Sequence, residues 1–276
     1  MNIYENYSVL LDLLILMIDS PRGQKIEDGH GWKNDAQALS RKLFHHLSTM
    51  QNISFGSTIT KKETIVYAFV DHSSIKVVAR AALETYLVFH FIYGCPTEDE
   101  RKFKHGLWHL AGLISRQDYP ASTDENKQKL LDEKAQIEGL KDEVRFSKYF
   151  CKFTPKQQKA LLKGDWRIKD SWQSIGVDAG FHPVYFKMIY NYLCGYSHSS
   201  YISALQVGQA QSIEEQERLA SGIIQIGLII MSHFVFSYEK VFNCSSQVLS
   251  NNPEAKGIAS IWCLKEKDMD AIYGAR

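Results

Sequence analysis

The sequence predicts an all-α protein, and three observations lead to this prediction. The chain contains only six prolines in 276 residues, so long stretches lack the residue that most often breaks helices. Apolar residues recur at helical spacing along most of the chain. Candidate capping boxes pair Ser122 with Glu125 and Ser212 with Glu215. We therefore expect a single bundle-like domain over residues 1–276, with roughly eight to ten helices around one core.

The N-terminal quarter is expected to hold two helices and one ambiguous segment. A helix over about residues 4–19 should stop before Pro21, and the polar, glycine-rich residues 22–31 indicate a loop. Residues 34–50 carry the next apolar stripe. Residues 64–70 are β-branched enough for a short strand, which stays open, but we favour a helical turn because no partner strand is evident.

The middle of the chain should contain the central helix. That helix opens between Asp71 and Ser74, ends at Tyr93 and is apolar on nearly every side. The next helix starts at Pro96–Thr97, where acidic residues suit its positive end. Residues 122–146 form a polar helical arm within the same domain, packed by its few apolar residues: Leu130, Leu131, Ile137, Leu140 and Val144.

Four further helices and one irregular stretch complete the prediction. Thr154 and Pro155 open a short helix, and residues 166–172 form an irregular stretch. The remaining helices start near Pro183, run from Ser212 to about Phe242, and cover about Pro253 to Ile272. The run from Leu219 to Tyr238 is nearly long enough to cross a membrane, but polar residues interrupt it, and we favour a buried core helix.

Composition excludes several classes of function. Basic and acidic residues number 32 and 31, so no global field attracts nucleic acid. The five cysteines are scattered without a CxxC pair, which argues against disulfide and zinc scaffolds and for a reducing, cytoplasmic compartment. His105 and His109 lie one helical turn apart without a third ligand, so we expect no metal and no cofactor. No phosphate loop, GxGxxG, HExxH or GxSxG motif occurs.

Two polar clusters are the candidate sites. Lys76, Arg80 and Glu84 form one stripe at four-residue spacing on the central helix, either solvated or as a buried ion pair. The second cluster surrounds His198, whose ring would hydrogen-bond Asn191 or a serine if it is structural. Gly195 and the following serines could also end the helix, with Ser199 or Ser200 capping the next one. The candidate binding residues of this cluster are Asn191, Tyr196, Ser197 and Ser199.

Three segments that contain these residues resemble a known protein family. The runs DHSSIKVVARAALETYLVFHFIYG, ERKFKHGLWHLAGLISRQ and YNYLCGYSHSSYISALQ resemble bacterial helical proteins grouped as domain of unknown function 5677, over about residues 70–238. The specific elements are Arg80 with Glu84, and Ser197–His198 followed by serine. The resemblance implies a helical fold and no established activity.

The architecture is also similar to the HEPN group of helical domains, many of which are metal-independent ribonucleases of defence and toxin systems. Their hallmark is an Arg followed by a His, with four to six residues between them. The match here is Arg41 to His46, outside the resembling region, and about one such spacing is expected by chance. If the protein had that chemistry, the resemblance implies that Arg80 would hold the phosphate and that His198 would act as acid or base on the ribose hydroxyl.

Two hypotheses of function follow. The first is a non-catalytic helical protein whose polar centre, Arg80, Glu84 and His198, is structural or binds a small ligand or partner. The second is a HEPN-like ribonuclease of a phage-defence or toxin system, with the same three residues as catalytic candidates and RNA as partner. A membrane-associated protein is a weaker third hypothesis, and a homo-oligomer is left open.

Overall fold

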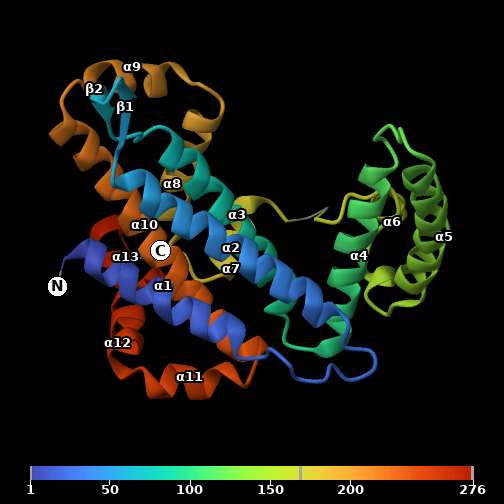
Figure 1. Ribbon diagram of the computed structural model, residues 1–276. Helices are drawn as coiled ribbons and strands as arrows, with labels where there is room; N and C mark the ends of the chain where they lie inside the picture. The colour runs from blue at the N-terminus through green and yellow to red at the C-terminus, as the bar shows by residue number, and fades with distance from the viewer. Residues whose placement is uncertain (1, 168–169, 275–276) are drawn as a thin grey trace. The chain divides into compact units, whose positions relative to one another are not determined.

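The computed structural model describes residues 2–167 and 170–274, and within them it confirms the all-α class (Figure 1). Thirteen α-helices and one two-stranded sheet lie in these ranges, more helices than expected because several connections fold into short helices. By its internal contacts the chain divides into two compact units. Unit 1 comprises Met1–His90 with Trp172–Arg276, and unit 2 comprises Phe91–Ser171.

Unit 1 is organised around α10 (Ile213–Val241). The expected capping box is present at its start: the Ser212 hydroxyl accepts from the Glu215 backbone N–H, and the Glu215 carboxylate accepts from the Ser212 N–H. Helices from both ends of the chain pack on α10 (Figure 1), among them α1 (Ile3–Asp19), α2 (Trp32–Ser54), α11 (Ser245–Asn251) and α12 (Pro253–Trp262). Almost every residue from Ile223 to Val235 is buried, as a helix at the centre of a core requires.

Aromatic rings join α3 (Ser74–Tyr93) to α10. Phe89 meets Phe234 edge to face with ring centroids 4.9 Å apart, and Tyr86 meets the same ring at 6.4 Å. All three side chains are essentially fully buried. Such pairs add roughly 0.5–1.5 kcal/mol each beyond the area that they bury. These contacts hold α3 in place within unit 1 and so position its polar stripe.

The α10 helix is the one membrane-span candidate within the described residues. It is long and apolar enough to cross a bilayer, but 67% of its most apolar stretch is buried inside the fold. This burial matches the expectation of a core helix for the run from Leu219 to Tyr238.

The expectation of a helical turn over residues 64–70 is wrong. This segment is strand β2 (Thr64–Phe69), and it pairs antiparallel with β1 (Ser57–Lys61). The partner strand is the β-branched run STITK just before it, and the turn between them uses positive φ angles at Lys62 and Glu63. Both strands are exposed along almost their whole length, so burial gives no alternating pattern that the sequence could reveal.

Unit 2 contains α4 (Glu98–Arg116), α5 (Asp124–Phe146), the 3-10 turn η1 (Phe150–Lys152) and α6 (Pro155–Leu161). The α5 helix is the predicted polar arm, and it packs on α4. Two small apolar clusters join these helices: Phe103, Leu107, Val144 and Leu161 in one, and Leu110, Leu113 and Ile137 in the other. Leu131, expected to pack the arm, is instead 55% exposed.

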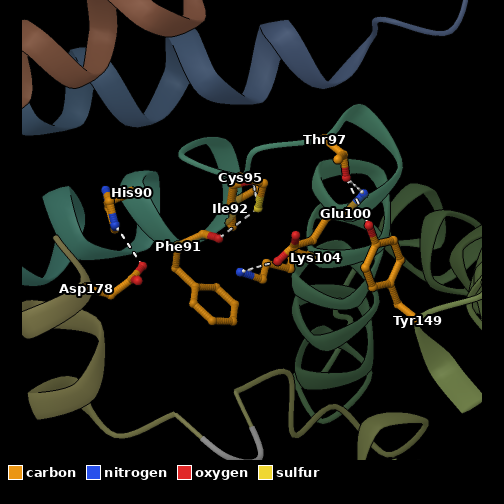
Figure 2. A network of polar contacts seen from close by, with 9 residues as sticks. All are labelled: His90, Phe91, Ile92, Cys95, Thr97, Glu100, Lys104, Tyr149 and Asp178. Atoms are coloured by element: carbon orange, nitrogen blue, oxygen red, sulfur yellow. Dashed lines mark hydrogen bonds and ion pairs between the residues drawn. The ribbon is translucent and has the colours of Figure 1, made fainter. Parts of the chain in front are cut away.

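A network of polar contacts surrounds the start of α4 (Figure 2). Lys104 pairs with Glu100 at 3.1 Å, and its ammonium lies 4.3 Å from the centroid of the Phe91 ring. The Cys95 thiol donates to the backbone carbonyls of Phe91 and Ile92, and burial raises the pKa of this thiol (Figure 2). Cys95 is therefore an inert core residue, as expected for a small buried hydrophobe.

Three boundaries differ from those that the sequence predicts. Thr123, not Ser122, caps α5, because its hydroxyl accepts from the Asn126 backbone N–H. Trp172 begins α7 (Trp172–Asp178), where an irregular stretch was expected. The predicted last helix is two helices, α12 and α13 (Glu266–Tyr273), separated by three non-helical residues.

Two glycines of α10 give a matched test of the core packing. A Cβ on Gly227 would lie 2.7 Å from a Tyr7 ring atom and 3.1 Å from the Met50 methyl, whereas a Cβ on Gly222 meets nothing within 4 Å. We expect Gly227→Ala to lower the free energy of unfolding by about 1–3 kcal/mol. We expect Gly222→Ala to raise it by roughly 0.5–1 kcal/mol, since alanine favours the helix. Urea denaturation of both variants measures this, and a Gly227→Ala protein as stable as Gly222→Ala would contradict the packing.

Candidate functional site

The Arg80–Glu84 pair predicted from the sequence lies between α3 and α8 (Pro183–Ser197) in unit 1. Arg80 Nε donates to Glu84 Oε1 at 3.0 Å, and the Tyr190 hydroxyl of α8 donates to the same oxygen at 2.8 Å. The two charged side chains are 21% and 28% exposed, so the pair is neither fully solvated nor buried. Burial alone would lower the pKa of Arg80, but Tyr190 and Glu84 outweigh it and raise the pKa. The guanidinium therefore stays charged and oriented.

His198 contacts this pair from the end of α8. Arg80 Nη1 lies 3.1 Å from His198 Nε2, although 118 residues separate them in the sequence. An arginine nitrogen can only donate, so Nε2 must accept, and the imidazole then carries its proton on Nδ1. The expectation that His198 is a buried partner of Asn191 or a serine is wrong: its side chain is exposed and its partner is Arg80.

The backbone at the end of α8 explains where His198 lies. The helix stops in a Schellman motif: the Ser200 N–H donates to the Gly195 carbonyl, and the Ser199 N–H donates to the Tyr196 carbonyl. Ser199 takes the left-handed conformation, with φ of 52°. Ser200 then caps α9 (Tyr201–Gln209) through the Ser203 N–H, which confirms one of the two expected caps. His198 is thus the C-cap of α8 and does not continue the helical face of its N-terminal neighbours.

Lys76, the third member of the predicted stripe, is fully buried. Its ammonium lies 2.9 Å from His72 Nδ1 and 4.1 Å from the centroid of the Tyr196 ring, with the Tyr192 ring at 5.6 Å. Burial lowers the pKa of Lys76 to about 8, and Asp71 opposes the change. Aromatic faces thus take the place of a carboxylate around this cation. The stripe therefore has two parts, a buried lysine in an aromatic cage and an accessible Arg80–Glu84 pair.

The four candidate binding residues have different surroundings. Asn191 is exposed, and its side chain makes no hydrogen bond within the described ranges. The Tyr196 hydroxyl donates to Gln206 Oε1 at 2.5 Å, and the Ser197 hydroxyl donates back to the Leu193 carbonyl. These contacts give Tyr196 and Ser197 local structural roles, while Ser199 shapes the backbone beside His198.

Sequence patterns alone missed Tyr190 and His72. Tyr190 shares the Glu84 carboxylate with Arg80, and burial followed by Glu84 raises the pKa of its hydroxyl. His72 lies one helical turn before Lys76, and its pKa is lowered by burial and then by the Lys76 charge. The four-residue spacing of the stripe extends back to His72, which was the available signal.

The Arg41–His46 spacing does not form a site. Both residues belong to α2, where five positions correspond to about 140° of rotation, so they face different directions. Arg41 is exposed and His46 is half-buried. Within the described residues no group of three or more His, Cys, Asp or Glu side chains is arranged to hold a metal ion.

The model of a family of unknown function (DUF5677) matches residues 66–216, more than half of the chain. The matched segment includes both α3 and α8 and therefore the whole Arg80, Glu84, Tyr190 and His198 cluster. No curated protein and no solved structure matches this chain.

Because Glu84 is partly exposed, its removal should lower the free energy of unfolding by less than the loss of a fully buried ion pair would. Glu84→Ala removes the acceptor of both Arg80 and Tyr190, so we expect a loss of about 1–2 kcal/mol in the free energy of unfolding. A fully buried ion pair would cost about 3–5 kcal/mol. The control is Glu138→Ala, whose exposed pair with Lys141 should contribute less than about 0.5 kcal/mol. Equal urea midpoints for the two variants would show that the Glu84 contacts do not stabilise the fold.

The lowered pKa of Lys76 makes the free energy of unfolding depend on pH in a direction that can be stated. Its pKa is about 8 in the fold against about 10.4 in an unfolded chain, so between these values the unfolded chain binds more protons and stability rises with pH. The Lys76→Met variant has no ammonium to bury, so this contribution to the free energy of unfolding is absent from it. We expect its stability advantage over wild type to shrink by roughly 1–3 kcal/mol from pH 7 to pH 10.

The control for this measurement is Lys187→Met, an exposed lysine on α8. Urea denaturation across the same pH range should show a constant difference between that variant and wild type. A constant difference for Lys76→Met as well would mean that Lys76 titrates as a solvated lysine.

Proposed function

The chain belongs to the family of unknown function DUF5677, and we propose that it is a helical binding protein whose Arg80–His198 centre recognises an anionic group on a small ligand or partner. The observation that carries the proposal is the accessible contact between Arg80 and His198. The amino-acid sequence alone is compatible with a structural centre and with a ligand-binding one. The exposure of His198 favours binding, because a purely structural residue gains most when it is buried.

The hydrogen-bonding capacity of the centre suits an acceptor-rich ligand. Arg80 has five N–H donors, and its bonds to Glu84 and His198 use two of them. The imidazole presents its Nδ1–H, because Nε2 is taken by Arg80. The planar guanidinium presents its donors as a fork that can bind two oxygens of a phosphate or carboxylate group at once. Glu84 balances the guanidinium charge, so recognition depends on directed hydrogen bonds more than on net charge.

A second candidate, the HEPN-like ribonuclease, is favoured by the same convergence of an arginine and a histidine. In that mechanism the guanidinium would hold the scissile phosphate, and the imidazole would exchange a proton with the ribose hydroxyl or the leaving oxygen. His198 would have to release Arg80 to free Nε2 as a base. This requirement is the reason why binding is the better-supported function.

The test uses inorganic phosphate as a probe and the imidazole signals of His198 as a local readout. We expect phosphate to shift the His198 signals in the NMR spectrum of the wild type, because its oxygens accept from Nδ1–H and the guanidinium. Arg80→Gln should abolish the shift, whereas Arg218→Gln, an exposed arginine on α10, should leave it unchanged. An unperturbed His198 in the wild type would contradict the proposal.

Incubation with transfer RNA in the presence of a chelator separates the two candidates. A binding protein leaves the RNA intact. If the wild type cleaves the RNA, and His198→Ala abolishes cleavage at an unchanged melting temperature, the ribonuclease replaces the binding function. The unchanged melting temperature is expected in either case, since the exposed His198 side chain should contribute less than about 0.5 kcal/mol.

A further inference from the structure

A basic cavity lies in unit 1, formed by residues outside the Arg80 centre. Its volume is about 490 Å³, and it is bordered by the end of α1, the loop after it, the first turns of α2 and Phe242. Cavities of roughly 300–1,000 Å³ accommodate small molecules of cofactor size. The predicted loop over residues 22–31 thus contributes to the wall of a concave site.

The charge of this cavity is unbalanced. Four cationic side chains line it, from Arg22, Lys25, Lys33 and Arg41, against the single carboxylate of Asp19. None of the four is paired with a carboxylate within the described ranges. Elsewhere lysines are commonly paired on their own helices, as Lys102 is with Glu98. A local surplus of three positive charges in a chain of net charge +1 needs counter-ions, and a concave wall concentrates that field.

One lining residue of the cavity is tied to the core of unit 1, and part of the lining is apolar. The Gln37 amide donates to the buried Tyr238 hydroxyl at 2.7 Å, which ties α2 to α10 at this point. Ile18, Ile26 and Phe242 supply apolar surface beside the cations. A ligand that satisfies both features carries several negative oxygens at one end and an uncharged body at the other.

We propose that this cavity binds a phosphorylated small molecule, such as a nucleoside phosphate, through Arg22, Lys25, Lys33 and Arg41. The phosphate groups lie among the cations, and the uncharged part of the ligand contacts Ile26 and Phe242. Arg41 lines this cavity and His46 does not, so Arg41 binds the ligand without His46. This site is independent of the Arg80–His198 centre, because the two share no residue.

The experiment is calorimetric titration of the full chain with adenosine diphosphate and with inorganic pyrophosphate. We expect the wild type to bind both probes more tightly at low salt, and adenosine diphosphate to raise the melting temperature. The double variant Arg22→Gln/Lys33→Gln should weaken binding by about tenfold or more and lose the thermal shift. Removal of two mutually repelling, exposed or half-buried cations should leave that variant folded.

Two controls make the result specific. Lys256→Gln removes an exposed charge from α12, and Arg80→Gln removes the arginine of the other centre; both should bind adenosine diphosphate as the wild type does. The proposal is overturned by the absence of binding in the wild type, by equal weakening in Lys256→Gln, or by weakening in Arg80→Gln alone. The last result would place the probe at the Arg80 centre and would leave the function proposed there standing.

Discussion

The burial of α10 is the constraint on which the rest of unit 1 depends. A helix of 29 residues with an almost continuous buried stretch must be covered on every side, and α1, α2, α11 and α12 do so from both ends of the chain. The α3 helix reaches α10 through large aromatic rings, Tyr86 and Phe89 against Phe234. Because these rings fix the apolar face of α3, its opposite, polar face is turned towards α8.

Polar contacts then match α3 to α8. Lys76 contacts the Tyr196 ring, and Glu84 accepts from the Tyr190 hydroxyl. The residue earlier in α3 therefore contacts the residue later in α8, which means that the two helices run antiparallel. Each contact satisfies a group that would be costly to leave unpaired between helices. Arg80 lies between these two contacts along α3, and its hydrogen bond to Glu84 orients the guanidinium, whose Nη1 reaches His198.

Local signals in the sequence predicted the helices and several of their caps, because a capping box or a proline at the first turn depends on residues three or four apart. The Ser212–Glu215 and Thr154–Pro155 starts are confirmed for this reason. The hairpin was missed because its strands are exposed on both faces and show no burial pattern. The Arg80–Glu84 pair follows from spacing on one helix, whereas the Arg80–His198 contact joins residues 118 positions apart and needs the tertiary fold.

The same distinction explains why the basic cavity could not be read from the sequence. Arg22 and Lys25 belong to a polar loop, and Lys33 and Arg41 belong to α2, so in the sequence each cation resembles an ordinary surface residue. The turn after α1 brings the loop beside α2, where the lining residue Gln37 is hydrogen-bonded to the buried Tyr238 of α10. Charges that are dispersed in the sequence then become a field around one volume, and like charges held together in this way favour an anion more strongly than any of them does alone.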